Sequence, residues 1–280
     1  MVESLQNTNP ERGGSIGRDA SFLRSGYKTI IPILAAGLVA GASACMSRPQ
    51  TLTVSAAASL TDAFTEITEA FEAANPGVTV ELNLAASGVL AQQIRQGAPA
   101  DVFASASAVV MDGLEAEGFL ADGTRQDIAA NRIVLVTPLD GPPVTGLQDL
   151  PDLPRVAIGD PALVPAGMYA QESLQAAGLW DPLEAQLLYG ETVRQVLAWV
   201  EAGEVPAGIV FVTDAHTSQR VRVVAELPPE SHQPIRYPIA VLGKSDAPDL
   251  AASFVAFVTG PEGQALLASE GFSPPVEDVP

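Results

Sequence analysis

Short strand patterns alternate with helix patterns along nearly the whole chain from Thr51 onward, and this alternation constrains the fold more than any other feature. The segment LTVSA at 52–56 has the pattern of a short apolar strand. The segment 59–77 then carries apolar residues at helical spacing on one face, namely Leu60, Ala63, Phe64, Ile67, Ala70 and Phe71. Alternating strands and helices are typical of mostly parallel sheets covered by helices, so we predict an α/β fold.

The first of these helices carries recognisable start and stop signals. Ser59 is its expected N-cap residue, with Asp62 three residues on as a variant of the capping box. The sequence Asn-Pro-Gly at 75–77 is expected to end it.

The length of the chain favours two sheets rather than one. No Ser/Gly-rich linker or charge block divides it, so we expect two lobes joined by crossing strands. The strongly apolar segment NRIVLVTP at 131–138 is the predicted first crossing, and RYPIAVL at 236–242 is the predicted return. We therefore predict one lobe from 45–130 plus 235–280 and a second lobe from 131–234.

Residues 1–44 differ in character from the remainder. Basic residues precede the apolar run TIIPILAAGLVAGASAC at 29–45. A basic flank, a short apolar stretch and small residues before a cleavage point describe a secretory signal peptide, and the run is too short for a comfortable membrane span. We therefore expect an exported protein.

The single cysteine of the chain, Cys45, ends this run. The ending GASAC resembles a bacterial lipobox, although Ala42 stands where leucine is usual. We expect Cys45 to be the lipidated N-terminus of a protein held at the outer face of the cell membrane or in the periplasm. The alternative is an exported protein with a free thiol, because a lone cysteine forms no intramolecular disulfide.

The charge of the chain excludes one class of partner. Lys and Arg number 14 against 33 Asp and Glu, a net charge of −19, and residues 1–44 hold four of the basic and three of the acidic side chains. A chain this acidic, with no basic patch, is expected to repel nucleic acid and anionic lipid heads. We expect a monomer with no nucleic-acid partner.

Catalytic and metal-binding motifs are missing from the sequence. It contains no G-x-S-x-G, Walker, G-x-G-x-x-G or H-E-x-x-H motif. His216 and His232 lie in polar stretches typical of the surface, and one cysteine does not support a thiolate zinc site. These features indicate a binding protein without a cofactor rather than an enzyme.

Small or hydroxyl residues recur where a strand pattern leads into a helix pattern. They are Ser59, Ser87, Ala166 and Gly167 after Pro165, and Thr192, which precedes Val193 at the start of the fourth helix. Helix N-termini present unpaired N–H groups and a partial positive charge, so they bind anions without a cationic side chain. Two junctions come from each half of the chain. If the lobes face each other, the four converge on one cleft.

Several longer segments resemble the periplasmic molybdate-binding proteins of ABC transporters, in order from about Leu52 to Phe272. They are AAASLTDAF, ASGVLAQQIRQGAPADVFASA, AIGDPALVPAGMYAQESLQAAGLWD, ETVRQVLAWVEAGEVPAGIVFVTDA and YPIAVL. The resemblance implies a type II periplasmic-binding-protein fold. It also implies capture of molybdate, and of tungstate, by neutral donors in an interlobe cleft for delivery to an ABC permease.

The resemblance also implies the ligand residues. The family's serine ligands fall on Ser59 and Ser87, and its backbone N–H ligands fall on Ala166 and Val193. The family's tyrosine falls on Phe211, which lines the cleft but donates no hydrogen bond. We expect Thr213, on the same strand face, or the Thr192 hydroxyl to compensate in part for the missing tyrosine donor.

Two other functions stay open at this point. A sulfate-type oxoanion receptor differs mainly in cavity size, which the sequence does not give. A secreted hydrolase needs a serine or carboxylate pair that no motif identifies. A cytoplasmic regulator would need a DNA-binding segment, and the sequence has none.

Overall fold

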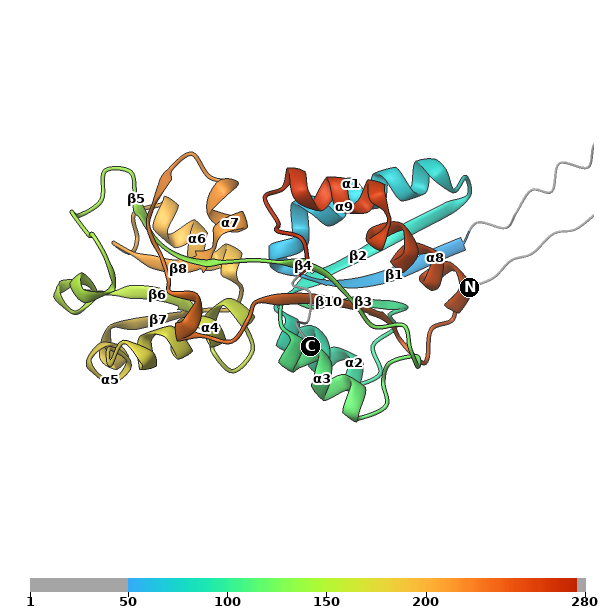
Figure 1. The fold of residues 1–280 in the computed structure, drawn as a ribbon, viewed down its shortest axis with the longest axis horizontal. Helices are drawn as coiled ribbons and strands as arrows, with labels where there is room; N and C mark the ends of the chain where they lie inside the picture. Colours follow the sequence, from blue (N-terminus) through green and yellow to red (C-terminus); the bar gives the residue numbers. More distant parts are fainter. Residues whose placement is uncertain (1–49, 276–280) are drawn as a thin grey trace, which may run out of the picture. The chain divides into compact units, whose positions relative to one another are not determined.

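The computed structural model describes residues 50–275. The expected signal peptide at 1–44 and the expected lipidation site Cys45 lie outside these residues. Within them, two five-stranded sheets are flanked by helices, as Figure 1 shows. We call each sheet together with its helices a lobe. The predicted two-lobed α/β fold is confirmed.

The first sheet has the strand order β2-β1-β3-β10-β4. Its strand β1 is parallel to β2 and β3, whereas β10 is antiparallel to β3 and β4. The strands are β1 (Gln50–Ala57), β2 (Val78–Ala85), β3 (Val102–Ala104), β4 (Gln126–Ala130) and β10 (Arg236–Val241).

The second sheet repeats this plan with the order β7-β6-β8-β5-β9. Here β6 is parallel to β7 and β8, and β5 is antiparallel to β8 and β9. The strands are β5 (Ile133–Pro138), β6 (Val156–Gly159), β7 (Leu187–Gly190), β8 (Gly208–Phe211) and β9 (Val221–Glu226).

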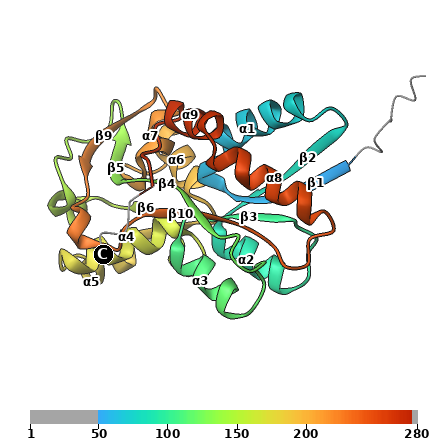
Figure 2. The same cartoon turned by 45° about the vertical axis from the view of Figure 1, so that its right-hand side comes forward.

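Each sheet is mixed but mostly parallel, as predicted: one strand, β10 in the first sheet and β5 in the second, runs opposite to the other four. The crossings explain this strand. The chain leaves the first lobe at the end of β4, passes through Asn131 and Arg132, and enters the second lobe as β5. It returns through 227–235 as β10, and Figures 1 and 2 show β4 and β10 side by side in the first lobe. Strands β5 and β10 start at the crossing segments, whereas the neighbouring strands of their sheets end on that side. Each of the two therefore runs antiparallel to its neighbours.

Helices cover both faces of the first sheet. Figure 1 shows α1, α8 and α9 on one face and α2 and α3 on the other. Phenylalanine rings of α1 and α8 pack edge to face, with the Phe71 and Phe254 centroids 5.1 Å apart. The helices are α1 (Thr61–Ala74), α2 (Ser87–Arg95), α3 (Ala108–Ala116), α8 (Pro248–Thr259) and α9 (Pro261–Ser269). In the described part of the chain no single helix is long and apolar enough to cross a membrane, and α8 and α9 meet those criteria only together, as a pair bent by 58°.

Helices also cover the second sheet, with α4 and α5 on one face and α6 and α7 on the other in Figure 1. Several connections contain short 3-10 segments. The helices are α4 (Pro165–Ala176), α5 (Trp180–Leu183), α6 (Val193–Glu201) and α7 (Val212–His216), and the 3-10 turns are η2 (Leu147–Asp152), η3 (Glu184–Gln186) and η4 (Pro229–Ser231).

Two local predictions are wrong. A 3-10 turn, η1 (Ala58–Leu60), separates β1 from α1, and the N-cap residue of α1 is Leu60 rather than Ser59. The Ser59 hydroxyl instead contacts the Tyr237 hydroxyl, which takes it out of the helix cap. Strand β8 ends at Phe211, so Thr213 lies in α7 and does not share a strand face with Phe211.

The start of α4 lies very close to the end of β6, and this contact yields a stability prediction. A Cβ at Gly167 would lie 2.0 Å from the carbonyl oxygen of Gly159, so Gly167→Ala forces two backbone segments apart. We expect a loss of about 1–3 kcal/mol in the free energy of unfolding, measured by chemical denaturation.

Gly113→Ala, inside α3, is the matched control for this prediction. Its added Cβ would meet only the flexible Arg95 guanidinium at 3.1 Å, and alanine is favoured over glycine inside helices by roughly 0.5–1 kcal/mol. A Gly167→Ala protein as stable as the Gly113→Ala protein would contradict the close packing of α4 on β6.

Candidate functional site

Strand ends and helix starts from both lobes meet around one small cavity. Its walls include all five residues that the sequence analysis assigned to the ligand or the pocket: Ser59, Ser87, Ala166, Val193 and Phe211. The other lining residues are small or apolar, namely Ala57, Ala58, Ala86, Ala106, Val164 and Pro165. Every side chain in this set is uncharged.

Ser59 reaches the cavity from η1, directly after strand β1. It is buried, and its Oγ lies 3.0 Å from the hydroxyl oxygen of Tyr237 on β10. No sequence pattern indicated a role for Tyr237. The alanines before Ser59 leave the backbone accessible at this turn, because they place no larger side chain in the cavity.

Ser87 is the first residue of α2 and is fully buried. Its Oγ accepts a hydrogen bond of 3.0 Å from the backbone N–H of Ala106. A hydroxyl that accepts one hydrogen bond still has its own proton to donate. The Ala106 N–H therefore fixes the Ser87 side chain, and the Ser87 hydroxyl proton remains free to donate.

Ala166 and Val193 bring two helix N-termini from the second lobe. Pro165 opens α4, and Thr192 caps α6 by accepting a hydrogen bond of 3.1 Å from the N–H of Gln195. The first N–H groups of a helix have no partner within the helix, and the aligned peptide dipoles give that end a partial positive charge. Both helix starts therefore supply neutral donors suited to an anion.

Phe211 ends β8 with its side chain buried between aromatic neighbours. Its ring meets Tyr169 and Tyr237 edge to face, at centroid distances of 6.3 and 5.8 Å. The two threonines expected to replace the missing phenol are not among the cavity-lining residues. Thr192 caps α6, and the Thr213 Oγ1 accepts a hydrogen bond from the Asn131 side chain.

The positive charge closest in sequence to the cavity residues is already paired. Arg194 follows Val193, and its guanidinium lies 2.6 Å from Asp62 in the first lobe and 2.5 Å from Asp214 in the second. Burial raises the pKa of Asp214 to about 6, and the Arg194 charge opposes this shift. Arg194 therefore links the lobes and is not a free cation for an anion in the cavity.

A second contact between the lobes lies beside Ser87. The N–H of Gly88 donates to the carbonyl oxygen of Leu163 at 2.9 Å. A Cβ at Gly88 would lie 2.6 Å from that oxygen, so only glycine permits this approach.

The cavity is small, with a volume of about 10 Å³. That is close to the minimum for one water molecule. A tetrahedral oxoanion therefore requires its walls to separate slightly.

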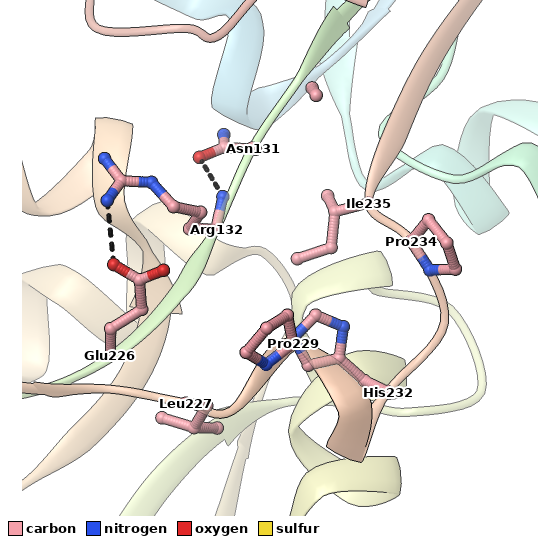
Figure 3. Close-up of a pocket in the computed structure, with 9 residues that line it drawn as sticks. Asn131, Arg132, Glu226, Leu227, Pro229, His232, Pro234 and Ile235 are labelled. Carbon is pink, nitrogen blue, oxygen red and sulfur yellow. Dashed lines mark hydrogen bonds and ion pairs between the residues drawn. The ribbon is translucent and has the colours of Figure 1, made fainter. Parts of the chain in front are cut away.

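A larger cavity of about 210 Å³ lies beside the crossing segments and is shown in Figure 3. Its lining is mainly apolar, and its arginine, Arg132, is ion-paired with Glu226 at 2.7 Å. It offers an anion no unpaired cation and no cluster of helix starts. Within residues 50–275, no group of three His, Cys, Asp or Glu side chains is placed to hold a metal ion.

Comparison with known proteins agrees with this geometry. Residues 52–273 match the family described as bacterial extracellular solute-binding protein. The molybdate-binding protein ModA of Haemophilus influenzae is 36% identical over 88% of this chain and 99% of its own length. ModA of Escherichia coli is 40% identical over 79% of this chain and 88% of its own. A putative ABC transporter substrate-binding lipoprotein of Bacillus subtilis, YvgL, is 38% identical over 88% and 98%.

Solved structures share the fold. The substrate-binding domain of a putative molybdenum ABC transporter from Clostridium difficile superposes with a TM-score of 0.63, at 36% identity, over 81% of this chain and 99% of that one. The periplasmic molybdate-binding protein of Azotobacter vinelandii gives 0.71 at 23% identity, over 80% and 100%. The sulfate-binding protein SubI of Mycobacterium tuberculosis gives 0.69 at 18%, over 80% and 87%. At these lower identities the likeness concerns the fold alone.

Two mixed sheets joined by crossing strands, with a cavity between the lobes, have the type II periplasmic-binding-protein fold. The chain belongs to the bacterial extracellular solute-binding proteins and, within them, to the ModA family. Family membership confirms the prediction of a binding protein rather than an enzyme.

Proposed function

We propose that this protein captures molybdate, and also tungstate, in the interlobe cavity and delivers it to an ABC permease. The observation that carries the proposal is the convergence of Ser59, Ser87, Ala166 and Val193 on one uncharged cavity. Relatives at 36–40% identity that bear the name molybdate-binding protein support the same ligand.

The chemistry of the donor set favours a fully deprotonated oxoanion. Backbone N–H groups donate only, and the Ser87 hydroxyl already accepts from Ala106. Hydrogen phosphate carries a proton that needs an acceptor, and these groups offer few. Cavity size does not separate molybdate from sulfate here, because a volume of about 10 Å³ is too small for either anion without movement of the walls.

The lobe boundaries proposed for this movement are 45–130 with 235–280 and 131–234. The ends of β4 at Ala130 and β9 at Glu226, and the starts of β5 at Ile133 and β10 at Arg236, support them. In this proposal the protein acts as a monomer, and the crossing segments between these strands absorb the opening and closing of the cavity.

The N-terminal part of the proposal is a lipid anchor on Cys45. Its support is the GASAC ending after the apolar run and the B. subtilis relative, whose name describes a lipoprotein. A lipid anchor would keep the exported receptor at the outer face of the cell membrane, close to its permease.

Replacing either serine tests the ligand residues. Ser59→Ala and Ser87→Ala each remove one donor to a charged ligand, which costs about 1.5–3 kcal/mol, or roughly tenfold to hundredfold in Kd. Titration calorimetry with molybdate, tungstate, sulfate and phosphate measures this on the folded proteins. Ser173→Ala is the control, since its buried hydroxyl bonds Ser231 away from the cavity.

Unchanged molybdate affinity in the double serine variant would remove these residues from the site. Binding of sulfate in preference to molybdate by the wild-type protein would replace the proposed ligand with a sulfate-type one.

Phe211→Tyr restores the phenol that the family has at this position. Since the ring lines the cavity, the added hydroxyl gives the anion one more donor, and we expect Kd for molybdate to fall about threefold to thirtyfold. Calorimetry on the two proteins measures the change. A tyrosine variant that binds no better than the wild type would mean that the anion does not need a donor there.

The lipid anchor predicts a specific N-terminus. Mass spectrometry of the protein from the membrane fraction of expressing bacteria should find an acylated Cys45 as the first residue. Cys45→Ser should abolish acylation and release the protein from that fraction. An unmodified secreted chain that starts at another residue would contradict the anchor.

A further inference from the structure

A chain of buried side-chain hydrogen bonds runs behind Ser59. The Nδ2 of Asn131 lies 2.9 Å from the Oγ1 of Thr213 and 3.1 Å from the hydroxyl oxygen of Tyr237. The Tyr237 hydroxyl lies 3.0 Å from the Oγ of Ser59. This series of hydrogen bonds thus connects the crossing segment at Asn131 to the cavity wall at Ser59.

The orientation of the Asn131 carboxamide sets the direction of these bonds. Its Oδ1 accepts a hydrogen bond of 2.8 Å from the backbone N–H of Arg132, drawn as a dashed line in Figure 3. A flipped carboxamide would bring its NH₂ group against that N–H, donor against donor. Asn131 therefore presents its NH₂ group to Thr213 and Tyr237 and donates to both.

The bond from Asn131 in turn sets the direction of the hydrogen bond between Tyr237 and Ser59. Its hydroxyl accepts from Asn131, and its own proton needs an acceptor because the side chain is fully buried. Among the described side chains, Ser59 is the second partner of this hydroxyl, so the Tyr237 proton goes to the Ser59 Oγ. Burial raises the pKa of Tyr237 well above its usual value, which keeps the hydroxyl protonated.

The hydrogen bonding of Ser59 then matches that of Ser87 at the other junction of the first lobe. The Ser87 Oγ accepts from the Ala106 N–H. With the Tyr237 proton directed to Ser59 by this reasoning, the Ser59 Oγ is also an acceptor. A hydroxyl has one proton, and in neither serine is that proton used by the group behind it. Both serines line the cavity.

We propose that Tyr237 and Asn131 are positioning residues that turn the Ser59 hydroxyl proton toward the cavity and so make Ser59 a preorganised donor to the oxoanion. The inference rests on the proposed function. In this arrangement the phenol of Tyr237 acts through Ser59 rather than on the ligand, whereas the family's phenol at position 211 would face the ligand itself.

A double-mutant cycle of Tyr237→Phe with Ser59→Ala tests the proposal by calorimetry with molybdate. Tyr237→Phe leaves the Ser59 hydroxyl free to rotate and removes the polarising bond, so Kd should rise about threefold to tenfold. In the Ser59→Ala background the same change should alter Kd by less than about twofold, because the group through which Tyr237 acts is gone. An equal effect in both backgrounds, or no effect in either, would overturn the proposal.

Tyr169→Phe is the matched control. Tyr169 is also buried against Phe211, but its hydroxyl interacts with Ser107. We expect its Kd to stay within about twofold of the wild type, and a loss as large as that of Tyr237→Phe would overturn a role specific to the chain behind Ser59.

Asn131→Asp gives a second test that keeps the side-chain shape. An ionised carboxylate only accepts, so Tyr237 would donate to residue 131, Ser59 would donate to Tyr237, and Ser59 would turn a lone pair toward the anion. The Kd for molybdate should rise by more than it does in Tyr237→Phe. In the Ser59→Ala background, the part of this rise that comes from the reversed Tyr237–Ser59 hydrogen bond should vanish. The part that comes from the added negative charge should persist. An Asn131→Asp loss that is unchanged in that background would contradict the reversal.

These results separate failure of the inference from failure of the proposed function. A wild-type protein that binds no molybdate would overturn both. Wild-type binding that weakens in Ser87→Ala, together with an additive cycle for Tyr237 and Ser59, would overturn the inference alone.

Discussion

The structure depends on bringing several hydrogen-bond donors to one point without a free positive charge. Four strand-to-helix junctions, two from each lobe, end at this point, and the nearby guanidinium of Arg194 is held by Asp62 and Asp214. Helix starts and hydroxyl groups bind an anion at fixed positions, and they do not attract every anion as a lysine would. The net charge of −19 is compatible with this, because charges beyond about 8 Å are largely screened at physiological salt.

The crossing strands make the convergence possible. Strands β1, β6 and β8 end at the cleft: Ser59 lies in the turn after β1, α4 starts after β6, and Phe211 is the last residue of β8. The strands that begin at the cleft, β5 and β10, run antiparallel to their neighbours and bring Asn131 and Tyr237 behind the cavity. The close backbone approach of Gly88 to Leu163 joins the Ser87 junction to the segment before α4, and that of Gly167 to Gly159 packs α4 on β6.

Local periodicity predicted the α/β class and the helices that begin near Ser59, Ser87, Ala166 and Val193, because an amphipathic pattern depends on residues close in sequence. Chain length and the lack of a linker predicted the two lobes. It did not predict β4 or β7, which are only five and four residues long. The Ser59 cap and the Thr213 strand position were wrong because a 3-10 turn and an early helix start replace the expected geometry. The four junctions followed from the helix patterns, and the resemblance to a family selected the ligand residues. The hydrogen bonds that connect Asn131 through Tyr237 to Ser59 were not predicted, since Asn131 and Tyr237 lie 106 residues apart and no local pattern joins them.

A crystal structure of the protein grown with molybdate, with anomalous data collected at the molybdenum absorption edge, shows directly whether molybdate binds between the lobes. We expect one strong anomalous peak between the two lobes. Its oxygens should lie within hydrogen-bonding distance of the Ser59 and Ser87 hydroxyls and of the N–H groups of Ala166 and Val193. A peak at the larger cavity beside Arg132, or a molybdate held by Arg194 or another charged side chain, would rule out binding by neutral donors between the lobes.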